Sequence, residues 1–155
     1  REAFIRLVND CRLTLYRISK NRLISDHDCA DAIQETIVKA YESIHTLWDA
    51  KQFKSWLVRI LINECNNILR SRSKHAYMEN ESGPNPAWTD DNLTTSLEIQ
   101  ELLNELPEEL RLPLVLFYLE DFPIKEIAKL LNTPEGTIKS RLYRTKEKLS
   151  RRIHR

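Results

Sequence analysis

Apolar residues recur at helical spacing along most of this 155-residue chain. Near the start they fall at i, i+3, i+4, i+7, i+11 and i+14, a pattern that predicts one helix ending near Asn21. These positions are Phe4, Leu7, Val8, Cys11, Leu15 and Ile18. A second helix is expected from Ser25, because Asp28 follows at the spacing of a capping box. Its expected apolar face is Cys29, Ile33, Ile37, Ala40, Tyr41 and Ile44.

Residues 45–52 lack periodicity and are expected to form a loop that contains Trp48. The periodic pattern then returns and predicts a third helix from about Phe53 to Arg72. Beyond it, residues 74–96 hold Gly83, two prolines and a net charge of −3, from one Lys against four acids. This composition is typical of a flexible acidic linker.

The helical pattern resumes at Leu97, where Thr95 and Glu98 have the spacing of a capping box. Pro107 is expected to start a new helix, and Pro113 should kink that helix or loosen its first turns. The chain therefore predicts an all-α protein of two small domains, 1–73 and 97–155, joined by the linker 74–96.

The last two predicted helices are separated by a sharp break in the pattern. Ile124–Leu131 is a short amphipathic segment, and its apolar face is expected to be Ile127, Ala128 and Leu131. Thr133 then suits an N-cap, and Pro134 suits the first position of the next helix. Two short helices around a tight turn predict a helix-turn-helix, whose second helix enters a DNA major groove.

The second helix of this pair is expected to bury Ile138, Leu142 and Leu149. Its other positions carry the residues expected to bind DNA, which are Thr137, Lys139, Ser140, Arg141, Tyr143, Arg144 and Lys148. Thr137, Ser140, Arg141, Arg144 and Lys148 are expected to face outward, with Lys139 and Tyr143 at the margins. Lys139, Ser140, Tyr143 and Arg144 are the expected base contacts, and Lys146, Lys148, Arg151 and Arg152 are expected at phosphates.

Charge is distributed unevenly along the chain, although its formal total is only +1. Residues 136–155 hold eight Lys or Arg and one acid, whereas residues 97–135 hold three and nine. A local positive surface is what phosphates require, so this distribution favours DNA binding by the C-terminal helix. The alternative from charge alone is a solvated basic helix packed on a small core.

Other classes of protein lack support in the sequence. No apolar run approaches the roughly 20 residues of a membrane span, so we expect no membrane insertion. The three scattered cysteines lack a CxxC pair and are expected to be free thiols in a reducing cytoplasm. His27 and Cys29 form half of a metal-ligand pattern without a second pair. We therefore expect no metal, cofactor or catalytic site.

Two polar sets in the N-terminal half are ambiguous by themselves. Asp31, Gln34, Glu35 and Lys39 form an outward stripe that is by default a solvated face. Asn63, Asn66 and Asn67 lie within one helix, although Asn is unfavourable there, which suggests hydrogen bonding to a partner or a polar helix face.

Three stretches of the sequence resemble the extracytoplasmic-function (ECF) group of bacterial RNA polymerase sigma factors. They are DCADAIQETIVKAY, FKSWLVRILINECNNILRSR and LPEELRLPLVLFYLEDFPIKEIAKLLNTPEGTIKSRLYRTKEKL. They cover most of the chain outside the linker and stand in the family's order. The chain departs from the family pattern at Asn67, where Asp is frequent, and at Pro123, where the helix usually opens with Ser or Thr.

The resemblance implies a role for each polar set. Asp31, Gln34 and Glu35 match positions that bind the coiled coil of the polymerase β′ subunit. Asn63, Asn67, Arg70 and the preceding loop match the part that captures the melted −10 element of a promoter. The helix-turn-helix matches the reader of the −35 element. The implied partners are core RNA polymerase (β′ and β subunits), promoter DNA and an anti-sigma factor.

Two other functions stay open at this point. A stand-alone helix-turn-helix regulator would bind duplex DNA as a dimer without polymerase. An adaptor protein would use its helical faces for protein partners and would show no salt-dependent DNA binding.

Overall fold

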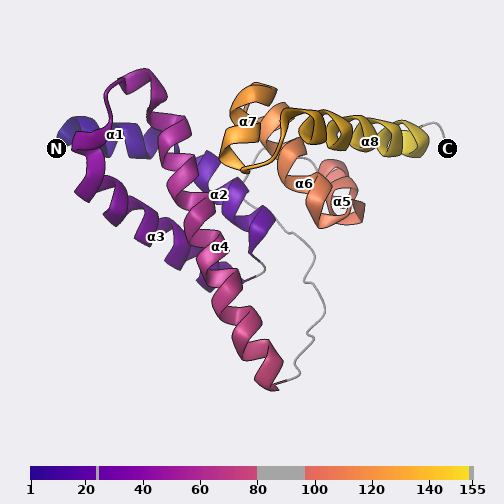
Figure 1. Cartoon of the computed structure of the whole chain (residues 1–155), viewed down its shortest axis with the longest axis horizontal. Coiled ribbons are helices and arrows are strands. Elements are labelled where there is room, and N and C mark those ends of the chain that lie inside the picture. Colours follow the sequence, from indigo (N-terminus) through magenta and orange to yellow (C-terminus); the bar gives the residue numbers. More distant parts are fainter. Residues whose placement is uncertain (24, 80–96, 154–155) are drawn as a thin grey trace. The chain divides into compact units, whose positions relative to one another are not determined.

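The computed structural model describes residues 1–23, 25–79 and 97–153, and in this part of the chain every regular element is a helix (Figure 1). The chain divides into two compact units, residues 1–86 and 87–155. The two-domain, all-α organisation predicted from the sequence is therefore confirmed.

The N-terminal unit is built on three mutually packed helices, α2, α3 and α4. Its elements are α1 (Glu2–Asp10), α2 (Arg12–Arg22), α3 (Asp26–Ser43), the 3₁₀ turns η1 (Ile44–Thr46) and η2 (Ala50–Gln52), and α4 (Phe53–Glu79). The C-terminal unit comprises α5 (Leu97–Glu105), α6 (Glu108–Leu114), the π-helical turn η3 (Val115–Leu119), α7 (Ile124–Leu130) and α8 (Glu135–Ile153).

The expectation of one continuous first helix is wrong, because the chain turns at Cys11 between α1 and α2. Cys11 adopts φ −99° and ψ 0°, and its N–H donates to the carbonyl of Val8, three residues back, at 3.0 Å. Asn9 and Asp10 precede the turn, and both residue types favour helix ends over helix interiors. Val8 and Leu15 are buried on either side, so periodicity alone does not reveal the break.

The start of α3 confirms Ser25 as its cap, since the Ser25 hydroxyl accepts from the backbone N–H of Asp28 at 3.2 Å. The carboxylate of Asp28 is used elsewhere. It accepts a hydrogen bond of 2.6 Å from Nη2 of Arg72 on α4, and Nε of Arg72 lies 2.6 Å from its other oxygen. Helix α4 continues to Glu79, beyond the helix end that the sequence predicts near Arg72. Residues 74–79 contain no Gly or Pro, and several of them favour helix.

Small residues set the packing of α3 against α4. Ala32, Thr36 and Ala40 are completely buried, and the Thr36 hydroxyl donates to the carbonyl of Ala32 at 2.6 Å. The predicted apolar face is therefore rotated from the true one, and Tyr41 is 54% exposed. Close helix contact favours small side chains, which a search for large apolar residues undervalues.

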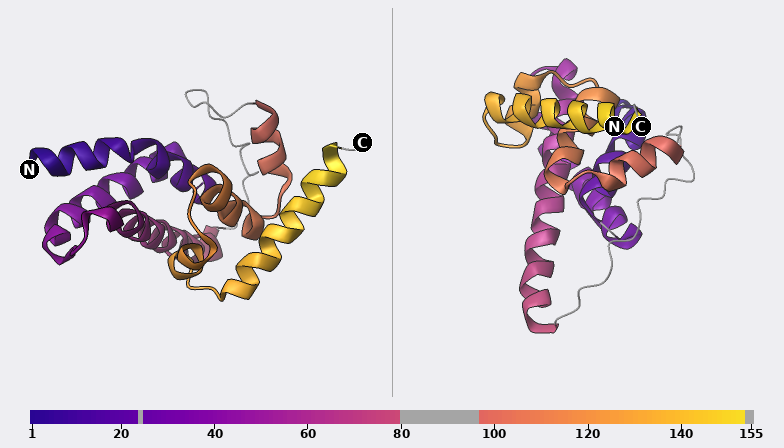
Figure 2. Two further views of the ribbon diagram at one scale, coloured as in Figure 1. Left: turned by 90° about the horizontal axis from the view of Figure 1, so that it is seen from above. Right: turned by 90° about the vertical axis from the view of Figure 1, so that its right-hand side faces the viewer.

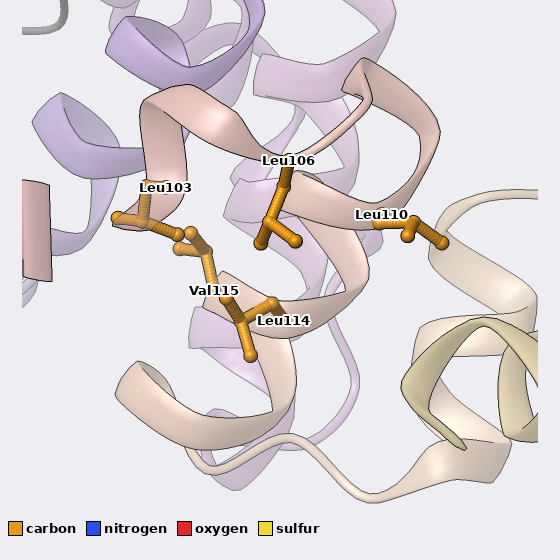
Figure 3. Packing of buried hydrophobic residues seen from close by; sticks show 5 residues of the cluster. All are labelled: Leu103, Leu106, Leu110, Leu114 and Val115. Atoms are coloured by element: carbon orange, nitrogen blue, oxygen red, sulfur yellow. The ribbon is translucent and has the colours of Figure 1, made fainter. Parts of the chain in front are cut away.

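The C-terminal unit has a leucine-rich core, shown in Figure 3. Its buried cluster is Leu103, Leu106, Leu110, Leu114 and Val115. Leu119 and Leu149 pack against this cluster, so the predicted inward position of Leu149 is confirmed. The Thr95–Glu98 capping box lies outside the part of the chain whose side chains the structure describes.

Proline residues shape α6 as the sequence predicts. Pro107 is the N-cap, with Glu108 and Glu109 in the first turn. Pro113 lies inside the helix, where it has no N–H to donate, and the π-helical turn follows directly. The N–H of Glu120 reaches back five residues to the carbonyl of Val115 at 3.0 Å, so the helix is loosened after Pro113 and not in its first turns as predicted.

Candidate nucleic-acid interface and docking surface

The turn between α7 and α8 is a Schellman motif, which ends α7 abruptly. Asn132 has φ 49° and lies in the left-handed region that Asn tolerates better than most residues. The N–H of Thr133 donates to the carbonyl of Ala128 at 2.9 Å, and that of Asn132 donates to Lys129 at 3.3 Å. This pair of bonds fixes the direction in which the next helix leaves.

Helix α8 starts at Glu135, one residue later than predicted, and the carbonyl of Pro134 accepts from the N–H of Ile138 at 3.1 Å. The Thr133 hydroxyl donates to the carbonyl of Leu131 at 3.0 Å, so this bond ties the turn back to α7. The turn is therefore stabilised from its α7 side as well as by the start of α8. Figure 2 shows α8 as a straight, unbroken helix.

Residues that anchor these two helices differ slightly from the prediction. Ile127 is buried on α7 as expected, but its partner is Leu130, because Leu131 is only half-buried at the turn. On α8, Ile138 and Leu142 are buried as predicted, and Thr145 joins them at 1% exposure. The Thr145 hydroxyl donates to the carbonyl of Arg141 at 2.9 Å, which satisfies it inside the core.

Because Thr145 is buried, the outward face of α8 is rotated about the helix axis relative to the face predicted from the sequence. Lys139 and Tyr143, expected at the margins, are exposed, and Tyr143 is 63% exposed. Thr137 and Arg141, expected outside, are only partly exposed. The other three residues of the predicted outward face are exposed as expected, namely Ser140, Arg144 and Lys148. The face centres on Ser140, whose hydroxyl donates to the carbonyl of Gly136 at 3.0 Å.

Basic side chains on α8 are mostly left without a carboxylate partner. Among the described residues of this helix, Arg152 alone forms an ion pair, at 2.6 Å to Glu105 of α5. The pair holds the end of α8 against α5, although the sequence placed Arg152 among the phosphate contacts. Lys139, Arg144 and Lys148 therefore present uncompensated positive charge at the surface, which attracts phosphate.

In the N-terminal unit, the predicted stripe on α3 is partly confirmed. Asp31, Gln34 and Glu35 are exposed, and the Nε2 atom of His27 lies 3.2 Å from a carboxylate oxygen of Asp31. Lys39 leaves the stripe, because its ammonium binds the buried carboxylate of Glu64 on α4. This bond raises the pKa of Lys39 above its ordinary value.

The Lys39–Glu64 pair lies in a groove between α3 and α4 with a volume of about 450 Å³. Asn63 and Asn67 line the same groove, and both are exposed, as is Arg70 one turn further along α4. Asn66 does not belong to this surface, since its side chain accepts a bond of 2.7 Å from Arg22. Of the three asparagines of α4, Asn66 therefore bonds within the unit, whereas Asn63 and Asn67 line the groove.

The loop before α4 presents a residue to which sequence reasoning gave no role of its own. Trp48 is 99% exposed, which is unusual for so large an apolar side chain. The signal in the sequence was a single aromatic residue within a stretch without periodicity. Trp56, by contrast, is half-buried and packs against Phe53 with ring centroids 5.9 Å apart.

The cysteines are buried free thiols, and burial raises the pKa of Cys29 and raises that of Cys65 to about 12. Within the described residues, no cluster of three or more His, Cys, Asp and Glu side chains could hold a metal ion. None of the described helices combines the length and apolar composition needed to cross a bilayer.

Two family models match the chain, one over each unit. The model for sigma-70 region 2 matches residues 7–75, and the model for sigma-70 region 4 matches residues 96–149. Together they define a sigma-70-type transcription initiation factor that retains these two regions.

Curated relatives identify the group within that class. The chain is 27% identical to ECF RNA polymerase sigma factor SigW of Bacillus subtilis, covering 98% of this chain and 89% of SigW. It is 29% identical to ECF RNA polymerase sigma-E factor of Haemophilus influenzae, covering 85% of this chain and 78% of that protein. The sigma factor RpoE of Bartonella quintana, solved in complex with the anti-sigma factor NepR, shares the fold. Its TM-score is 0.85 at 21% identity, over 99% of this chain and 98% of RpoE.

The chain belongs to the ECF group of RNA polymerase sigma factors. It directs promoter-specific initiation of transcription and is not an enzyme. The two matched regions in this order set aside the stand-alone regulator and the adaptor as primary functions, since neither class requires region 2.

Proposed function

We propose a division of tasks among three surfaces of this sigma factor. The outward face of α8 reads the −35 element, the groove and loop beside α4 hold the −10 element, and the stripe on α3 docks on core RNA polymerase. The observation that carries the proposal is the exposed basic face of α8, which follows a helix-turn-helix turn. Among the described residues of α8, only Arg152 is held by an acid.

At the −35 element, residues near the start of α8 reach deepest into the major groove. Lys139, Ser140, Tyr143 and Arg144 are exposed there and become the base contacts. An arginine can bind guanine through two hydrogen bonds, which makes Arg144 the strongest single determinant of sequence. Lys148 lies farther along and meets phosphates. The partly buried Thr137 and Arg141 flank the face and suit contacts with the DNA backbone.

At the −10 element, the asparagines of the groove supply amides that both donate and accept hydrogen bonds. Asn63 and Asn67 can therefore bind the Watson–Crick edge of an unpaired base. Trp48 projects from the neighbouring loop and offers an aromatic face on which a base can stack. Arg70 supplies charge for the backbone of the melted strand.

At the docking stripe, exposed acceptors face outward from α3. Asp31, Gln34 and Glu35 can bind Arg and Lys side chains of the β′ coiled coil through charge-assisted hydrogen bonds. Further contacts to the β subunit belong to the same assembly. We infer that the protein works in the cytoplasm, where its polymerase partner is.

An anti-sigma factor is the expected regulator. The Bartonella quintana protein of the same fold was solved with the anti-sigma factor NepR. A second protein of the same fold, CnrH, was solved in complex with the cytosolic domain of CnrY, and its TM-score is 0.66 at 22% identity. A partner of this kind would hold the present chain inactive by covering its docking and DNA-binding surfaces.

Transcription in vitro tests the proposal. Core polymerase is incubated with a promoter library, with and without the chain, and the start sites are mapped by sequencing. We expect a small set of promoters that share a −35 and a −10 sequence and are transcribed only when the chain is present. Glu35→Lys should remove this activity, whereas Glu2→Lys, an exposed charge reversal on α1, should retain it. Equal activity of the two variants would contradict the docking assignment.

A further inference from the structure

The outward face of α3 has an apolar centre. Residues two apart on a helix lie on nearly opposite sides, because each residue turns the helix by about 100°. Thr36 and Ala40 are both completely buried, so Val38 between them points directly away from the unit. Val38 is nevertheless apolar and β-branched, and it is 45% exposed. Neither helix propensity nor core packing explains a valine at this position.

Val38 is surrounded by the residues of the docking stripe. Its neighbours at i−4 and i−3 are Gln34 and Glu35, and its neighbours at i+3 and i+4 are Tyr41 and Glu42. All four are exposed. Polar residues on the outward face of α3 therefore surround an apolar residue. Protein interfaces commonly have this arrangement, with a water-excluded apolar centre and a polar rim.

The apolar surface extends beyond Val38 toward α1. Tyr41, one turn along α3, is 54% exposed, and its ring packs edge-on against Phe4 at a centroid distance of 5.4 Å. Tyr41 and Phe4 also line a groove of about 500 Å³, and the other lining residues are Arg1, Ala3, Leu7 and Ile44. Val38 and Tyr41 are neighbours at i and i+3 on α3, and Tyr41 contacts Phe4. These three residues form an apolar strip, whereas scattered single apolar residues need no explanation.

Charge selects the partner that fits this strip. Three acids lie beside it on α3, namely Asp31, Glu35 and Glu42, and the nearest Lys of the helix, Lys39, is bound to Glu64. A matching surface must therefore be basic around an aliphatic or aromatic side chain. A basic helix of the polymerase coiled coil has this chemistry if it presents one apolar side chain among Arg and Lys residues.

We propose that Val38 and Tyr41 form the apolar anchor of the polymerase-docking surface, and that the acids beside them steer the encounter. The proposal rests on the proposed function of the α3 stripe and deepens it. The two kinds of residue act on different steps of binding. Acids at a rim raise the association rate and make it sensitive to salt, whereas a buried apolar anchor slows dissociation at any salt concentration.

The test measures association and dissociation rates of the full chain with core polymerase at two salt concentrations. Val38→Ala should raise the dissociation rate about fivefold to thirtyfold at both, with little change in association. Val38→Thr, which keeps the shape and adds a hydroxyl, should behave similarly, and Val38→Met should restore slow dissociation. Glu35→Gln should instead slow association and weaken its dependence on salt. Leu13→Ala, which truncates a 39% exposed leucine on α2, is the matched control and should change neither rate.

The outcomes separate the anchor from the docking stripe itself. If Glu35→Lys abolishes binding while Val38→Ala dissociates at the native rate, the anchor is refuted and the docking stripe stands. If neither variant affects binding, both proposals are overturned. Circular dichroism of Val38→Ala should match that of the native chain, because alanine is the better helix former.

Discussion

Helices α3 and α8 both bury a narrow stripe and expose a polar face, but they use their charges differently. In the N-terminal unit the charged side chains join helices to one another, as Arg72 does to Asp28 and Lys39 does to Glu64. In the described part of α8, only Arg152 is held by an acid. Residues 1–73 contain twelve Lys or Arg, more than the eight in residues 136–155. Among the described residues of the N-terminal unit, acids hold Lys20, Lys39 and Arg72.

The comparison teaches that the pairing of charges, and not their number alone, decides which charged side chains are available to phosphate. A charge already bonded within its unit is partly neutralised and costs energy to release, whereas an unpaired surface charge is available at once. The N-terminal unit thus gains specific helix pairing from its charges, and the C-terminal unit keeps its charges for a ligand.

Removal of a core leucine should affect one unit and leave the other intact. Leu110 is 1% exposed within the α5–α6 cluster, so Leu110→Ala should destabilise the C-terminal unit by about 2–5 kcal/mol. Hydrogen exchange followed by mass spectrometry should show faster exchange in peptides from residues 97–153 and unchanged exchange in peptides from residues 1–79. Equal loss of protection in both regions would mean that the chain unfolds as one unit and would break the comparison.

The pairing of charges in the N-terminal unit should be measurable as stability. Asp28→Asn removes the carboxylate that pairs with the Arg72 guanidinium, which donates a hydrogen bond of 2.6 Å to it, and should cost about 1–2 kcal/mol. Asp31→Asn, an exposed carboxylate on the same helix, is the control and should stay within about 0.5 kcal/mol of the native chain. Urea denaturation measures both, and equal midpoints for the two variants would contradict the structural role of the Asp28–Arg72 pair.

Two basic residues of α8 should differ in their contribution to DNA binding. Lys148→Ala should lower the slope of log affinity against log salt by roughly one unit, because an unpaired lysine releases a counterion on binding phosphate. Arg152→Ala should change the slope less, since Glu105 already holds its guanidinium at 2.6 Å. A larger change for Arg152→Ala would show that the ion pair opens on DNA and that pairing does not predict availability.

The smallest effect concerns the buried thiols, which should be inert at neutral pH. The pKa of Cys65 is raised to about 12 by burial, so the folded state keeps a thiol that the unfolded chain loses above its ordinary value of 9.0. The Cys65 thiol therefore leaves the free energy of unfolding unchanged below pH 9. The free energy of unfolding falls as the pH rises from 9 toward 12, because only the unfolded chain loses the proton. At pH 8 a thiol reagent should label Cys65 only after urea unfolds the chain. Rapid labelling of the folded chain would contradict its burial.

Much of the fold was available from periodicity and from the turn residues. The spacing of Ile138 and Leu142 located the buried stripe of α8, and Pro107 and Pro113 marked the start and the loosening of α6. The spacing did not locate the break at Cys11, because a helix that bends toward the core keeps its apolar residues in phase. The spacing of apolar residues also does not predict that Thr145 is buried, because Thr counts as a polar residue. Its hydroxyl can be buried because it donates to a carbonyl of its own helix.

The ion pairs of the N-terminal unit could not be predicted from the sequence, for a different reason. Lys39 and Glu64 lie 25 residues apart, and Asp28 and Arg72 lie 44 residues apart, so no local pattern connects them. The stripe on α3 was consequently predicted with Lys39 as a member, although its ammonium turns to α4. Val38 gives no signal of its own in the sequence, because the polar residues around it predict a solvated face.

The central claim is that α8 reads sequence through its exposed basic face. The most direct measurement is the affinity of the polymerase complex for a promoter selected in the transcription experiment, compared with the same promoter carrying a scrambled −35 element. Arg144→Ala should cost about 1–3 kcal/mol on the selected promoter and much less on the scrambled one. Lys148→Ala should weaken both by a similar factor. If Arg144→Ala also weakens both promoters equally, Arg144 contacts phosphate, and the reading face assigned to α8 is wrong.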